Sequence, residues 1–150
     1  MSGLKVGSKA PDFSLPGTGG KVYSLDQFDH GLILAFYPGD FTPVCTKQFC
    51  SYRDDGDRLE SLGVPLLGIS PQSVDSHERF SRENALTTPL ASDPDKEVAK
   101  AYGALGPGGF IRRAVFVIDG SGVIRYRHVP LFGLTYHDVD DLEKAVATLA

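Results

Sequence analysis

The sequence predicts an α/β protein in which a mixed β-sheet lies between helices. An uninterrupted apolar run, Leu32–Tyr37, is typical of a central strand that is covered on both faces. Strand-like and helix-like patterns then alternate along the chain. Near the end, two strand-like segments are joined by a short loop that contains glycine, and one more helix follows. Alternation followed by a hairpin and a closing helix indicates parallel and antiparallel strands in one sheet, between layers of helices.

Composition and charge exclude several classes of protein. The chain has 150 residues, of which 41% are hydrophobic and 23% are charged, and its formal net charge is −4. We see no internal repeat or linker, so we expect a single domain over residues 1–150. The excess of acidic residues argues against a nucleic-acid partner. No apolar run is long enough to cross a membrane and no apolar signal segment opens the chain, so we expect a cytoplasmic protein without a membrane partner.

The N-terminal half contains a predicted hairpin, the central strand and a long helix. Short strands at Phe13–Leu15 and Val22–Ser24 flank a glycine-rich turn. The helix is predicted from about Thr42 to Leu62, with Gly63 as its stop signal. On one face of this helix, residues of the core recur at spacings of 4, 3, 4 and 3. We call this face the core stripe: Cys45, Phe49, Tyr52, Gly56 and Leu59.

The later elements alternate in type. The predicted segments are a strand at Pro65–Ser70, a helix at Val74–Asn84, a strand at Pro89–Ser92, a helix at Lys96–Tyr102, hairpin strands at Ala114–Asp119 and Val123–His128, and a last helix at about Asp138–Leu149. The last helix opens with acidic residues, which suit the positive end of its dipole, and it has an apolar face.

One of the two cysteines, Cys45, falls at the start of the long helix. Thr42 is a strong N-cap candidate and Pro43 suits the first helical position, so Cys45 is the third helical residue. The backbone N–H groups of this first turn have no carbonyl partner. Together with the helix dipole they favour a thiolate, which indicates a reactive sulfur. The alternative is a small apolar side chain buried on the core stripe.

The second cysteine, Cys50, lies about 140° around an ideal helix from Cys45. It therefore leaves the core stripe and should be reachable by solvent or by a partner. Two Cα atoms five residues apart in a helix are about 8 to 9 Å apart, beyond the limit of about 7 Å for a disulfide. The two cysteines can pair only if the start of the helix unwinds. From the residues alone, an incidental second cysteine remains an open alternative.

Other candidate sites are weaker. The two cysteines lack a matching second pair of zinc ligands, and the four histidines show no ligand spacing. The glycine-rich segment at residues 106–109 is not followed by the Gly-Lys-Ser/Thr of a phosphate loop, so we expect a mobile loop. Arg112 and Arg113 precede a strand, and such a pair is usually solvated at the strand edge. Only a position beside Cys45 would make one of them catalytic, and neighbouring strand residues point to opposite faces.

The residues around Cys45 resemble a known family closely. The pattern Pro38-x-x-x-Thr42-x-x-Cys45 is similar to the active-site signature of peroxiredoxins. Its setting, Phe-Tyr-Pro-Gly-Asp-Phe-Thr-Pro-Val-Cys-Thr with Cys50 following, resembles the bacterioferritin-comigratory, or Q-type, subfamily. Further similar segments run along the chain: Ala10–Leu15, Gly68–Ser70, Ser76-His77, Ala101–Gly103 and Arg113–Asp119.

The resemblance implies a thioredoxin-like fold with an N-terminal β-hairpin extension, and a thiol peroxidase that reduces hydrogen peroxide and organic hydroperoxides without a metal or organic cofactor. It implies that Cys45 is the peroxidatic cysteine and Cys50 the resolving cysteine, which form an intramolecular disulfide as in an atypical 2-Cys enzyme. Thr42 would hydrogen-bond the peroxide, Pro38 would shield the pocket, and Arg113 would be the cation beside the thiolate. The implied partners are a peroxide and thioredoxin or a similar dithiol, and we expect a monomer rather than a dimer.

One residue departs from the family pattern. Gln48 stands where the Cys-x-x-Glu run of the family has glutamate, and an amide can hydrogen-bond an arginine but cannot form an ion pair with it.

Two rival functions also stay open. A thiol-disulfide oxidoreductase of the same fold usually has Cys-x-x-Cys, whereas this chain has Cys-x4-Cys. A redox sensor or holdase would oxidise Cys45 without turnover.

Overall fold

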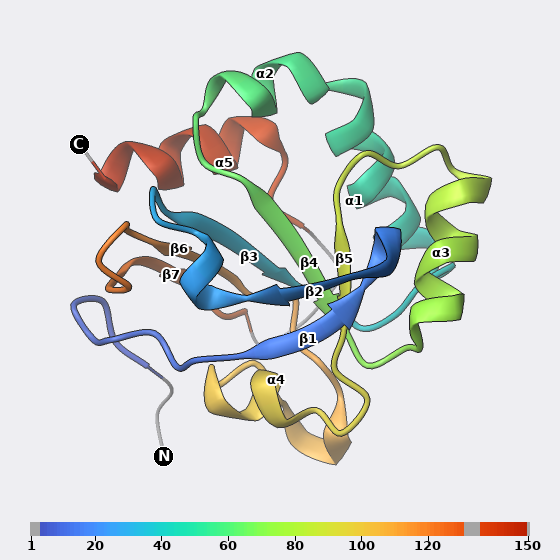
Figure 1. Ribbon diagram of the computed structural model, residues 1–150, viewed down its shortest axis with the longest axis horizontal. Helices are drawn as coiled ribbons and strands as arrows, with labels where there is room; N and C mark the ends of the chain where they lie inside the picture. The colour runs from blue at the N-terminus through green and yellow to red at the C-terminus, as the bar shows by residue number, and fades with distance from the viewer. Residues whose placement is uncertain (1–3, 131–135, 150) are drawn as a thin grey trace.

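The computed structural model describes residues 4–130 and 136–149, and the strands in these ranges form one seven-stranded sheet (Figure 1). Its order is β2-β1-β5-β4-β3-β6-β7. The strands are β1 (Ser14–Gly17), β2 (Lys21–Ser24), β3 (Leu32–Phe36), β4 (Leu66–Ser70), β5 (Leu90–Ser92), β6 (Val115–Ile118) and β7 (Ile124–His128). Each lies within about two residues of its predicted position.

The sheet is mixed, as the sequence predicts. Strand β4 runs parallel to both β3 and β5, whereas β6 is antiparallel to β3 and to β7. The N-terminal hairpin β1–β2 extends the far edge of the sheet through Gly17, which lies opposite Ala91 of β5. A Cβ atom at Gly17 would lie 2.4 Å from the carbonyl oxygen of Leu90, so the close approach of the two strands requires glycine.

Helices cover both faces of the sheet (Figure 1). They are α1 (Pro43–Asp54), α2 (Gly56–Ser61), α3 (Val74–Glu83), α4 (Glu97–Ala101) and α5 (Val139–Val146). The alternating side chains of β3 divide the core into two layers. Ile33 and Ala35 pack with residues of α1, α3 and α5, whereas Leu32 and Leu34 pack with residues of α4 and of the N-terminal segment. Every residue of β3 is buried, which confirms the predicted central strand.

The prediction of one helix from Thr42 to Leu62 is wrong, because the helix is interrupted at Asp55. The backbone of Asp55 has φ −99° and ψ 27°, and a separate helix, α2, begins at Gly56. Glycine is a poor helix former, which favours a break at this point. Asp55 still donates its N–H to Ser51 and accepts one from Leu59, so the core stripe continues across the break and the periodicity concealed it.

The ends of the other helices follow the predicted signals. Gly63 adopts φ +72° where the sequence places a stop signal. The last helix begins with Asp138 as N-cap, in a capping box with Asp141, and it ends at Val146, before a 3-10 turn at Ala147–Leu149. None of the helices described by the structure is long and apolar enough to cross a membrane.

Candidate active site

Cys45 lies in the first turn of α1, as the sequence predicts. Thr42 is the N-cap residue and Pro43 opens the helix. The N–H of Cys45 donates to Thr42 Oγ1 over 3.3 Å, so the cap is bonded to the cysteine itself. Such a cap stabilises a helix by about 1 kcal/mol. Cys45 has no exposed surface, and the core contacts it makes belong to the same layer as Tyr37 and Phe49. A substrate therefore reaches the sulfur only after a local movement.

Thr42 also organises the turn that precedes the helix. Its hydroxyl donates to the carbonyl oxygen of Gly39 over 3.2 Å, and its own carbonyl accepts from the N–H and the hydroxyl of Thr46. Pro38 opens this turn and is partly exposed. Phe41 adopts φ +66°, a conformation that costs a non-glycine residue about 1 to 2 kcal/mol. The turn therefore needs support from outside the helix.

That support comes from Asp40, whose carboxylate is completely buried. Tyr37 donates to Asp40 Oδ1 over 2.7 Å, and Ser76 and His77 of α3 both approach Oδ2 to 2.7 Å. The backbone N–H of Asp40 donates to Gln72 Oε1 over 3.0 Å. The turn before Cys45 is thus fastened to the loop between β4 and α3 and to α3 itself.

Asp40 and His77 have the geometry of a buried ion pair. His77 Nε2 lies 3.0 Å from the carbonyl oxygen of Ala91, which can only accept, so this nitrogen carries a proton. Nδ1 faces Asp40 Oδ2, and an ionised carboxylate only accepts, so Nδ1 donates this hydrogen bond. Burial raises the pKa of Tyr37 well above its ordinary value, and Asp40 raises it further, so the phenol stays protonated and donates.

The sequence did not indicate this pair. Asp40 and His77 both lie in segments that resemble the family, but they are 37 residues apart and no periodicity connects them. The paired parallel strands β3 and β4 bring the two together, because the loops that follow parallel strands meet at one edge of a sheet.

Arg113 is buried and reaches α1 through Gln48. Its Nη1 donates to Gln48 Oε1 over 3.1 Å, and the amide Nε2 of Gln48 donates to the Tyr52 hydroxyl over 3.0 Å. Tyr52 in turn donates to the carbonyl oxygen of His137 over 2.6 Å. The amide therefore connects Arg113 to α1 without the ion pair of the family pattern. Gln48 is three residues after Cys45, so both lie on one face of the helix.

The neighbouring Arg112 points the other way, as strand geometry predicts. Its backbone N–H donates to Ala104, and its side chain lines a cavity beside α4 rather than the α1 side of the sheet. Of the two arginines, Arg113 is the one that is bonded to α1, the helix that contains Cys45.

Cys50 is partly exposed on α1. Its Sγ lies 3.8 Å from Asn84 Oδ1, at the end of α3, and both cysteines are free thiols. The residues that flank it in the core, Phe49 and Tyr52, have no exposed surface, and their rings lie 5.4 Å apart. Cys50 has thus left the core stripe, as the sequence predicts, while its helix is held firmly beneath it.

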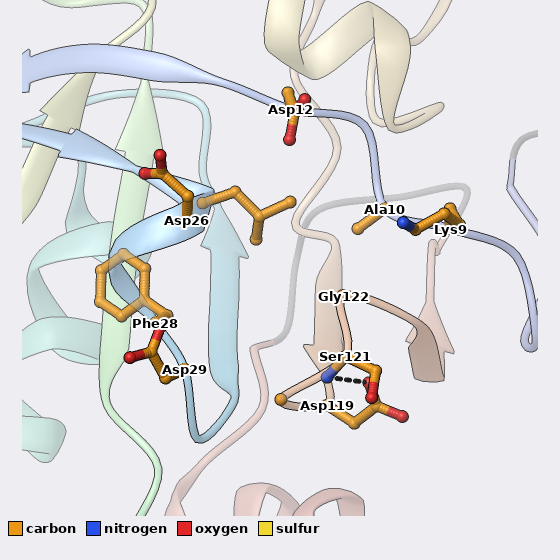
Figure 2. Close-up of a pocket in the computed structure, with 11 residues that line it drawn as sticks. Lys9, Ala10, Asp12, Asp26, Phe28, Asp29, Asp119, Ser121 and Gly122 are labelled. Carbon is orange, nitrogen blue, oxygen red and sulfur yellow. Dashed lines mark hydrogen bonds between the residues drawn. The ribbon is translucent and has the colours of Figure 1, made fainter.

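A separate pocket of about 200 Å³ lies away from both cysteines, between the N-terminal segment and the β6–β7 turn (Figure 2). Four carboxylates line it: Asp12, Asp26, Asp29 and Asp119. In Figure 2 their side chains stand apart around the rim. Across residues 4–130 and 136–149, no group of three acidic, histidine or cysteine side chains is arranged to hold a metal ion.

The chain is similar in sequence and in structure to proteins of one known family. The AhpC/TSA family model matches residues 6–127. A relative from Coxiella burnetii, named putative peroxiredoxin bcp, is 42% identical over 129 residues, covering 81% of this chain and 85% of its own. Peroxiredoxin Bcp of Escherichia coli is 37% identical over 147 residues, covering 93% and 94%. The crystal structure of peroxidoxin BcpB from Mycobacterium tuberculosis superposes with a TM-score of 0.82 at 31% identity, covering 97% and 96%.

The thioredoxin-like fold, together with the match to the AhpC/TSA model and to the Bcp peroxiredoxins, places the protein in the class of thiol peroxidases. The chain belongs to the AhpC/TSA family and is a peroxiredoxin that is similar to the Bcp proteins. The family implies a peroxide as substrate and a thiol as reductant.

We expect Asp40 and His77 to be strongly coupled. Asp40→Ala and His77→Ala should each lower the free energy of unfolding by about 3 to 5 kcal/mol, because each leaves a buried charged partner without its counterpart. The double variant should lose clearly less free energy of unfolding than the sum of the losses in the two single variants. Urea denaturation of the four proteins measures this, with the exposed Asp95→Asn as control. Additive losses would contradict the ion pair.

Proposed function

We propose that Cys45 is the peroxidatic cysteine. The supporting observation is its position as third residue of α1, where its own N–H is bonded to the Thr42 cap. The Cys45 thiolate attacks the terminal oxygen of a peroxide and the O–O bond breaks. The other peroxide oxygen takes up a proton and leaves as water or an alcohol. The product is a sulfenic acid on Cys45.

We propose that Thr42 and Arg113 stabilise the charge that moves from sulfur to the leaving oxygen. The Thr42 hydroxyl now donates to Gly39, and it can turn its proton toward a peroxide without losing the cap, because the lone pair that accepts the Cys45 N–H is unaffected. The Gln48 amide holds the Arg113 guanidinium beside the first turns of α1. Donors placed before the reaction stabilise a developing anion more than mobile water does. Pro38 opens the same turn and would shield the reacting atoms.

We propose that Cys50 resolves the sulfenic acid. Its thiolate attacks the oxidised sulfur, a disulfide forms, and water leaves. Because Cys45 is buried and Cys50 is five residues further along one helix, the disulfide requires the first turns of α1 to unwind. Unwinding also exposes the disulfide to an external dithiol. We propose thioredoxin or a similar dithiol for this role, which makes the protein an atypical 2-Cys peroxiredoxin, monomeric and cytoplasmic.

The roles of the two cysteines can be separated by mutation. Cys45→Ser should abolish peroxide reduction, whereas Cys50→Ser should retain one fast turnover, accumulate sulfenic acid and over-oxidise readily. Stopped-flow peroxide consumption, followed by mass measurement of the trapped products, compares both variants with the parent protein. A fast phase of peroxide consumption in Cys45→Ser would contradict the assignment of Cys45 as the peroxidatic cysteine. Repeated turnover by the parent with thioredoxin excludes a sensor, and peroxide consumption excludes a simple thiol-disulfide oxidoreductase.

Arg113→Ala should slow peroxide attack by about one hundredfold, the effect of removing one donor to a developing oxyanion. The comparison is made where Cys45 is fully ionised, as followed by ultraviolet absorbance, so that a change in thiolate fraction is not counted. Arg125→Ala is the matched control, because Arg125 is an exposed strand residue that pairs with Asp119. If both variants react at the rate of the parent, Arg113 is not part of the site.

A further inference from the structure

A cationic cavity of about 980 Å³ lies on the opposite side of the sheet from Cys45. It is bounded by α4, by residues 103–106 and 112, by β7 and by the N-terminal segment. Four of its lining residues are cations, from four different parts of the chain: Lys5, Lys100, Arg112 and Arg127. No acidic residue of the described part of the chain lines it, although the protein as a whole has a net charge of −4. The local charge is therefore opposite to that of the molecule.

These cations have no ion-pair or hydrogen-bond partner in the part of the chain that the structure describes. Among residues 4–130 and 136–149, none of the four side chains forms an ion pair or a hydrogen bond. By contrast, Arg58 bonds Asp140 and Glu143, and Arg125 bonds Asp119. Four like charges around one hollow repel one another, and an anion in the hollow would relieve that repulsion.

Arg112 is held in place as part of the cavity wall. Its Nε has no exposed surface and no hydrogen-bond partner in the described part of the chain. Its stem packs against Gly106, where a Cβ atom would lie 3.0 Å from that Nε. A buried donor without a protein partner is unusual in a folded protein, and a water molecule or a ligand would satisfy it. The flat guanidinium, with its parallel donors, matches the oxygens of a phosphate.

We infer that this cavity binds a small organic phosphate with two or more negative charges, of the size of a nucleoside diphosphate. The volume lies in the range of small-molecule sites and exceeds what a single inorganic ion needs. The wall also contains apolar side chains, Leu105 and Val129, which would contact the organic part of the ligand. The phosphates would lie on Arg112 and Arg127. This inference is independent of the peroxidase mechanism.

Titration calorimetry of the full chain with adenosine diphosphate tests it. We expect saturable binding that weakens as salt increases. Arg112→Gln should weaken it by about tenfold or more, the loss of a hydrogen bond to a charged group. Arg125→Gln is the matched control, because it removes one charge from β7 outside the cavity. The affinity of this variant for adenosine diphosphate should stay within about twofold of that of the parent protein. Inorganic pyrophosphate should bind more weakly than the nucleotide, because it has no organic part.

Three results would overturn the inference: no heat up to millimolar nucleotide, equal losses in Arg112→Gln and Arg125→Gln, or pyrophosphate binding as tight as the nucleotide. Circular dichroism verifies that each variant folds. If Arg112→Gln does not fold, Lys100→Gln replaces it, because Lys100 is an exposed lining residue of α4 whose loss removes charge without disturbing the core. Unchanged affinity in that variant would then overturn the inference equally.

Discussion

Both cysteines of this peroxiredoxin lie on one helix, and the mechanism that we propose depends on how firmly the first turns of that helix are held. When α1 is folded, Cys45 lies in its first turn and its N–H donates to the Thr42 cap. In the same folded state, helix geometry keeps Cys50 out of disulfide reach. The proposed mechanism therefore requires a helix that is ordered for the attack on peroxide and locally unwound for resolution.

The contacts around α1 divide it into parts of unequal stability. The turn before it is fastened by the buried Asp40–His77 pair, and the helix is fastened at Phe49, whose ring lies 4.7 Å from that of Tyr37. Exposing a buried phenylalanine costs about 1.5 to 3 kcal/mol. Between these two anchors, α1 is secured by its cap, by the burial of Cys45 and by the hydrogen bond of Gln48 to Arg113. Opening costs least at the end of a helix, so we expect unwinding to begin at the first turns of α1.

Local patterns predicted most of this fold, because they reflect interactions between near neighbours in sequence. The apolar run of β3, the Thr42 cap and the turn at Gly63 are such signals, and all lie where expected. Contacts that join distant segments were not predictable. The pairing of Asp40 with His77 depends on the packing of β3 against β4, and the cationic cavity combines residues from four segments. The break at Asp55 was missed because the core stripe continues across it.

Amide hydrogen exchange on the reduced and the oxidised protein tests the requirement for unwinding most directly. In the reduced protein, amides from Thr46 onward are protected by bonds such as that from Thr46 to the Thr42 carbonyl. In protein shown by mass to contain the intramolecular disulfide, we expect protection to be lost between about Val44 and Tyr52, while strands β3 and β4 keep theirs. Equal protection of residues 44–52 in both forms would contradict the account, since a disulfide would then have formed across an intact helix.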